Sequence, residues 1–253
     1  MRIRIRFSKE GPVRFVGHLD FMRSFQKSVK KSGLPACYSA GFNPHMLLSF
    51  AAPLAIGEET RGDYADVDFA FRDEAPLTPQ EAYRLSDMGL ENEQLPPPPA
   101  APDFCRILSA AMPEGVSVNG AARVGLIKGS KAMALVRYAS WEIRPVDGFL
   151  SGVDIPAQLS AFCSQDSIVI HKKAKNSEKD VDIRPLIRHL AADDGIIFLT
   201  CASGSTENLK PAAVMEAFAA FLGRDFDPFG FRLLRTELMD ENLTPLLLLG
   251  TEF

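Results

Sequence analysis

A chain of 253 residues of which 46% are hydrophobic can bury the core of one large domain or two smaller ones. Its net charge of -4 and its pI near 5.6 argue against a stand-alone nucleic-acid-binding domain, because such domains are usually basic overall. The strongest apolar stretch, 246–249, is too short to cross a bilayer, and the basic start lacks the apolar segment of a signal peptide. We therefore expect a cytoplasmic protein without membrane association.

The cysteine pattern excludes several kinds of metal and cluster chemistry. The four cysteines are widely spaced and form no Cys-x-x-Cys or Cys/His pair at zinc-ligand spacing. They also lack the three-cysteine motif that binds the iron-sulfur cluster of a radical S-adenosylmethionine (SAM) enzyme, so such chemistry would have to come from a partner. Phosphate-loop, dinucleotide-binding, serine-hydrolase and zinc-protease motifs are missing as well. We assign no cofactor and no metal, and favour a protein that is not an enzyme.

The first predicted element is a strand with a row of positive charge. In residues 2–7 arginines alternate with apolar residues, which predicts that Arg2, Arg4 and Arg6 lie on one face of the strand. We expect the strand to continue, or to pair as a hairpin, through 13–16.

An amphipathic helix is predicted from Leu19 onward. An apolar stripe forms one side, and Gly33 followed by Pro35 ends the helix. A second stripe is cationic and consists of Arg23, Lys27, Lys30 and Lys31.

Residues 1–40 contain nine Lys or Arg and two acidic residues, which gives this segment a charge of +7. Such a basic surface on an acidic protein suits a polyanion or an acidic protein partner, although a plain solvated surface is an equal alternative. Asp66 and Asp68 of a later strand offer a structural use for the arginine row. Pairing between them would weaken the polyanion hypothesis.

Further elements follow in the order β-α-β-β. Short extended segments at 37–39 and 47–50 flank a turn at 41–45, and 64–71 alternates as a strand. Thr78 and Pro79 predict the start of a helix over 81–88. The proline-rich run 96–102 favours a stiff polyproline conformation, so we place a boundary there.

The second half repeats this succession of elements. Strands are expected at 133–143, 167–171, 181–183, 196–201 and 231–237, and helices at 156–163 and 211–222. The predicted fold is α+β, with two ferredoxin-like β-α-β-β-type halves that a duplication would explain. The predicted domains are 1–95 and 103–253, joined by the linker 96–102.

Two motifs carry the candidate chemistry. His18 and Asp20 stand where strand gives way to helix, and His45 follows a Gly-Phe-Asn-Pro turn. If these three side chains meet in one cleft, they can bind a metal or exchange protons. The alternative is local: Asp20 is a first-turn acid and His18 bonds to the backbone.

The turn at 41–45 is the more specific motif. Gly41 permits a positive φ, Asn43 must be extended before Pro44, and Pro44 fixes where His45 points. A functional interpretation has Phe42 stacking on a base while Asn43 and His45 supply hydrogen bonds, as single-stranded RNA recognition requires. A merely rigid hairpin turn is the alternative.

These motifs carry a family resemblance across residues 2–72. They are Phe15-Val-Gly-His-Leu-Asp20, Met22-Arg23, Gly33-Leu-Pro35, Gly41-Phe-Asn-Pro-His45, Ser49-Phe-Ala51, Pro53-Leu54, Gly57 and Asp66. Together they resemble the radical-SAM-associated (radical-SAM-linked) protein family of uncharacterised function. The resemblance is thinner beyond, at 181–185 and 209–211. Members occur fused to, or encoded beside, a radical SAM protein with a cobalamin-binding region, so the resemblance implies a radical SAM enzyme as partner.

The chain departs from the family pattern at Gly17, where Ser is more typical, and at Met46-Leu47, which replace a Pro-Lys pair. Our leading hypothesis is a non-catalytic RNA-binding or substrate-presenting accessory protein for a separate radical SAM enzyme, with the arginine row and the helix cations binding phosphates. An enzyme that uses His18, Asp20 and His45 is the first alternative. A pure protein docking module is the second.

Overall fold

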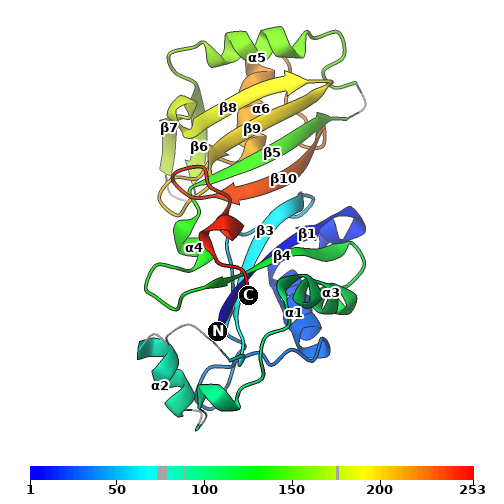
Figure 1. Ribbon diagram of the computed structural model, residues 1–253. Helices are drawn as coiled ribbons and strands as arrows, with labels where there is room; N and C mark the ends of the chain where they lie inside the picture. Colours follow the sequence, from blue (N-terminus) through cyan, green and yellow to red (C-terminus); the bar gives the residue numbers. More distant parts are fainter. Residues whose placement is uncertain (73–78, 88, 90, 147, 175–176) are drawn as a thin grey trace. The chain divides into compact units, whose positions relative to one another are not determined.

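The computed structural model describes residues 1–72, 79–87, 89, 91–146, 148–174 and 177–253, and the chain forms two compact units (Figure 1). The first unit comprises Met1–Val136 with Leu238–Phe253, and the second comprises Arg137–Glu237. These bounds differ from the expected domains 1–95 and 103–253, because the chain after the proline-rich run still belongs to the first unit. The α+β class is confirmed.

The first unit is built on an antiparallel sheet. Its strands run in the order β4-β1-β3, and β2 pairs with β3 on the edge that does not face β1. Their bounds are β1 (Arg2–Lys9), β2 (Leu48–Phe50), β3 (Glu59–Asp68) and β4 (Val116–Val124).

Two helices, α1 and α3, cover the apolar face of this sheet. Ile3, Ile5 and Phe7 of β1 are buried in one hydrophobic cluster with Phe25 of α1 and Phe104 of α3. The helices of the unit are α1 (His18–Lys31), α2 (Pro79–Asp87), α3 (Ala101–Ala111) and the short α4 (Ala132–Leu135), with 3-10 helices η1 (Gly11–Phe15), η2 (Asn92–Gln94) and η4 (Leu246–Leu249). The predicted period-2 alternation of β1 therefore buries its apolar side chains as expected.

Two predictions for this unit are wrong. Residues 13–16 form no strand, because Gly11 takes a φ of +74° and Pro12 lies in the first turn of η1. The proline-rich run also does not end in a linker, since Pro102 occupies the first turn of α3. Proline is tolerated there because the first amides of a helix have no intrahelical partner.

The strands of the second unit have the order β10-β5-β9-β8, and β6 and β7 form a separate hairpin. Helix α6 lies behind the strands of this unit in Figure 1. The elements are β5 (Tyr138–Pro145), α5 (Ile155–Cys163), β6 (Val169–Ala174), β7 (Ser177–Asp182), η3 (Arg184–Leu186), β8 (Ile187–Asp193), β9 (Ile196–Ala202), α6 (Pro211–Phe221) and β10 (Phe231–Met239). Strand β8 was not expected from the sequence.

The two units share a strand order. The spatial order is β4-β1-β3-β2 in the first unit and β10-β5-β9-β8 in the second. If the β6-β7 hairpin is left out, both orders place the fourth strand of the unit first, followed by its first, third and second strands. The ferredoxin-like halves and their duplication stay predictions. Within the described part of the chain, no helix has both the length and the apolar character needed to span a bilayer.

Candidate nucleic-acid interface

The arginine row of β1 serves the fold, because neighbouring aspartates neutralise two of its three members. Arg4 is 0% exposed and donates through Nε to Asp66 Oδ1 at 2.9 Å and through Nη2 to Asp66 Oδ2 at 3.1 Å. Arg2 is 6% exposed and forms the same bidentate pair with Asp68, through Nε to Oδ1 at 2.7 Å and through Nη2 to Oδ2 at 3.3 Å. The register explains the match, since Arg2 faces Asp68 and Arg4 faces Asp66 across the β1–β3 pair.

The ends of other segments close this face of the sheet. Arg4 donates to the carbonyl oxygens of Ser130 at 2.6 Å and Leu246 at 3.1 Å, and Asp66 accepts from the amide of Ala132 at 2.6 Å. Gly120 of β4 admits η4, because a Cβ there would lie 2.7 Å from Leu247 Cδ2. The prediction that Arg2 and Arg4 bind phosphate is therefore wrong: their guanidinium groups are buried and already bonded. Arg6, on the same face, is half-buried and also has a partner.

The cationic stripe of α1 lies at the surface, as predicted. Phe21, Phe25 and Val29 face the core, while the four cations of the stripe, Arg23, Lys27, Lys30 and Lys31, are all exposed. Arg23 donates to Asp20 at 3.1 Å, and both side chains of this pair are solvated. A pair of this kind contributes little stability. The stripe therefore remains a positively charged helix face.

The loop that follows α1 also projects into solvent. Residues 40–45 are exposed, and Phe42 is fully so. Ser39 fixes the base of the loop: its Oγ accepts from the His45 amide at 3.0 Å and shares a hydrogen bond of 2.8 Å with His45 Nδ1. An exposed aromatic ring on a constrained loop is suited to stacking on a base.

His18, Asp20 and His45 have separate surroundings. The His18 ring meets Phe50 edge-on at 5.5 Å, Asp20 binds Arg23, and His45 binds Ser39. Neither cavity found in the described residues is lined by more than one of the three. In the same residues, no group of three or more His, Cys, Asp and Glu side chains is placed to hold a metal ion. The contacts thus match the local alternative for Asp20.

A cavity of about 10 Å³ adjoins His18. It is also lined by Lys9 and Asp63, which are 2% and 3% exposed. Lys9 Nζ donates to the Val16 carbonyl at 2.9 Å and lies 5.1 Å from the centre of the Phe21 ring. A space of this size holds one water molecule, so no substrate fits it.

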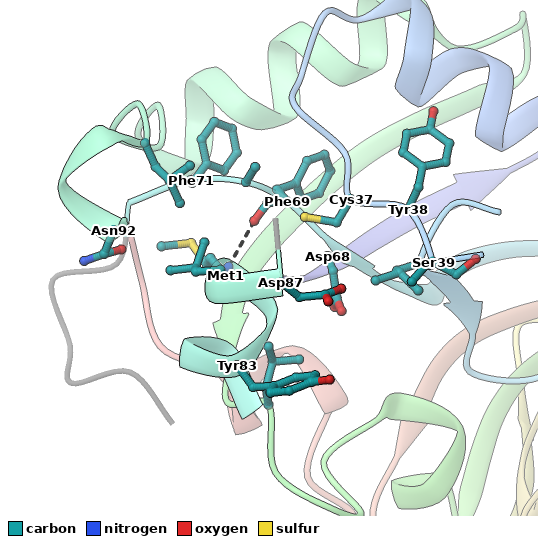
Figure 2. Close-up of a pocket in the computed structure, with 16 residues that line it drawn as sticks. Met1, Cys37, Tyr38, Ser39, Asp68, Phe69, Phe71, Tyr83, Asp87 and Asn92 are labelled. Atoms are coloured by element: carbon teal, nitrogen blue, oxygen red, sulfur yellow. Dashed lines mark hydrogen bonds between the residues drawn. The ribbon is translucent and has the colours of Figure 1, made fainter. Parts of the chain in front are cut away.

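A second cavity of about 250 Å³ opens at the base of the loop (Figure 2). Its walls come from three parts of the first unit: the segment after α1, the end of β3 with the residues that follow, and α2 with η2. Aromatic and polar side chains share the labelled lining with Met1 and Cys37. The aromatic residues are Tyr38, Phe69, Phe71 and Tyr83, and the polar residues are Ser39, Asp68, Asp87 and Asn92.

Sequence reasoning did not find this cavity. Tyr83 and Asp87 are four residues apart on α2, and this spacing places them on one helix face. That pair was a visible signal in the predicted helix 81–88. Its meeting with Tyr38 and Phe69 depends on tertiary packing and has no local sequence signature.

Comparison with known proteins gives one result. No curated protein matches the sequence significantly. A family model described as "Uncharacterized protein conserved in bacteria (DUF2344)" matches residues 2–95 and 85–211. Together these matches cover more than half of the chain, so the protein belongs to this family of uncharacterised bacterial proteins.

Proposed function

We propose that this protein is a non-catalytic RNA-binding accessory protein that presents RNA to a separate radical SAM enzyme of the cobalamin type. The observation that carries the proposal is the exposed cationic face of α1, followed along the chain by the exposed loop with Phe42. The cations can bind RNA phosphates, and such contacts carry no sequence information. The aromatic ring of Phe42 can stack on an unpaired base.

The α1 face is a better polyanion site than the arginine row. Lys27, Lys30 and Lys31 are exposed, and the only acid on the helix, Asp20, lies in its first turn and pairs with Arg23. Arg2 and Arg4 of β1 instead have carboxylates within 3 Å. Electrostatic attraction for RNA therefore concentrates on a small part of an acidic protein.

The radical SAM partner rests on the sequence resemblance over residues 2–72. The absence of a cluster-binding cysteine motif assigns the radical chemistry to that partner. A non-catalytic role is further supported by the separate surroundings of His18, Asp20 and His45.

A filter-binding assay with the natural host's total RNA, titrated over salt concentration, tests RNA binding. The slope of log affinity against log salt should fall by about 2 in the variant Lys27→Gln/Lys30→Gln/Lys31→Gln, because each phosphate contact on a single strand contributes about 0.7. The matched control Lys179→Gln/Lys210→Gln/Arg232→Gln removes three exposed cations from the second unit and should leave the slope unchanged.

Equal slopes in both triple variants would refute the α1 interface, and no binding by the wild type would refute RNA binding altogether. Affinity purification of the tagged protein from its host tests the partner. We expect a radical SAM protein and RNA in the same eluate. Recovery of a partner protein without RNA would favour the docking-module alternative instead.

A further inference from the structure

We infer that the 250 Å³ cavity holds one unstacked guanine base of the RNA whose phosphates bind α1. This inference rests on the proposed function and names the base that the site recognises.

The size of the cavity limits its ligand to one small ring system. Pockets for drug-sized ligands typically enclose about 300–1,000 Å³, so a cavity of about 250 Å³ suits a single nucleobase better than an extended cofactor. Its innermost aromatic walls are preformed: Phe69 and Phe71 are 0% and 4% exposed, and their rings stack with centroids 5.6 Å apart.

Helix α2 supplies both elements of base recognition. Tyr83 is 72% exposed and Asp87 is exposed, and both line the cavity from one side of the helix (Figure 2). The Tyr83 ring offers a flat surface on which a base can stack. One turn further along, the Asp87 carboxylate offers two acceptor oxygens.

The choice of guanine follows from hydrogen-bond complementarity. Guanine presents the N1–H and N2–H donors side by side on its Watson–Crick edge, which allows both to bind one carboxylate. Adenine and cytosine bring one exocyclic amine beside a ring acceptor, and uracil brings a single ring N–H. The second carboxylate of the cavity, Asp68, is held by Arg2 at 2.7 Å, so Asp87 is the one placed to select.

The path of the RNA is consistent with the positions along the chain. Tyr38 and Ser39, which line the cavity, follow the end of α1 with its Lys30 and Lys31. Ser39 is also the residue that holds His45, and thereby the loop carrying Phe42. A strand bound by the cations and by Phe42 can therefore place one of its bases in the cavity.

Calorimetric titration of the full-length protein with GMP, AMP, CMP and UMP tests the base pocket directly. We expect GMP to bind about tenfold more tightly than the other three, as a two-point contact to a base discriminates by one to two orders of magnitude. The variant Asp87→Asn should lose this preference. The control Asp103→Asn removes an exposed carboxylate of α3 outside the cavity and should retain it. Tyr83→Leu should weaken all four nucleotides, while Tyr83→Phe should restore binding.

Two results would overturn the pocket assignment. The first is equal affinity for the four nucleotides. The second is Asp87-dependent binding of spermidine without binding of GMP, which would assign the two carboxylates to an organic cation. Both leave salt-dependent RNA binding intact, whereas the absence of RNA binding in the filter assay would remove the proposed function itself.

Discussion

The two units of this protein share a strand order and differ in the face of their strands that the long helices leave uncovered. In the first unit that face carries buried Arg–Asp pairs beneath α4 and η4. In the second unit it carries Tyr138, Ser140 and Phe198, which are partly exposed. Ser140 Oγ and Thr200 Oγ1 hydrogen-bond across β5 and β9 at 2.9 Å. The two units therefore have the same strand order but present different residues on the face that the long helices leave uncovered.

This contrast shows why a row of arginines is an ambiguous signal. The alternation in β1 and the aspartates of β3 are both visible in the sequence, and either can face a ligand. The antiparallel register joins them, and both members of each pair are buried. A buried ion pair of this kind adds little net stability, because the desolvation of the two charges offsets their attraction. The cations that remain available lie on α1 instead.

The largest expected effect is the loss of a buried ion pair in the first unit. Arg4→Leu leaves the Asp66 carboxylate buried without its main partner, which should lower the free energy of unfolding by about 3–5 kcal/mol. Denaturant unfolding followed by circular dichroism measures this. The control Arg106→Leu breaks an exposed pair and should change stability by less than about 1 kcal/mol. Similar values for the two variants would show that the burial of the Arg4–Asp66 pair does not set the cost of breaking it.

In the second unit, two adjacent residues of β9, Phe198 and Leu199, lie on opposite faces of the strand. Leu199 is 1% exposed and pairs with Trp141, so Leu199→Ala should cost about 2–5 kcal/mol. Phe198 points to the partly exposed face, and Phe198→Ala should cost less than half as much, although it removes a larger side chain. Fluorescence of the single tryptophan follows this unit during unfolding. A larger cost at Phe198 would mean that its face is covered.

The smallest expected effect is a pH dependence confined to the second unit. Burial raises the pKa of the Cys201 thiol from 9.0 to about 12, and its Sγ lies 3.3 Å from the Leu209 carbonyl. A raised folded-state pKa gives stability that is complete below pH 9.0 and declines as the pH rises toward 12. The free energy of unfolding should fall by roughly 1 kcal/mol between pH 9 and pH 10 relative to Cys201→Ala. Parallel pH profiles for the two proteins would contradict this.

Much of the fold was accessible from sequence periodicity. The arginine alternation of β1, the amphipathic stripe of α1 and the proline-started helix α6 all lie close to their predicted positions. Helix α3 and the strands β4 and β8 were missed. The start of α3 was assigned to the proline-rich run, because Pro102 lies in the first turn of the helix. Most residues of β8 are exposed or half-buried, so the strand shows no clear apolar alternation.

Part of the candidate site could be predicted from the sequence, and part could not. The exposed stripe of α1 and the exposed loop follow from helix periodicity and from the Gly-Phe-Asn-Pro-His sequence, because neighbouring residues are sufficient to define them. The aromatic cavity could not be predicted, because its walls come from segments as far apart as Tyr38, Phe69 and Asp87.

By itself, the sequence determined the charge of α1, the constrained turn before His45 and the alternation of β1, since each depends on residues a few positions apart. Only the tertiary structure decided that Asp66 neutralises Arg4 and that α2 brings Tyr83 and Asp87 to the cavity. The physical reason is that strand register and helix packing set the distances between charges that are remote in the chain, and those distances decide whether a charge is buried in a pair or left to bind a ligand.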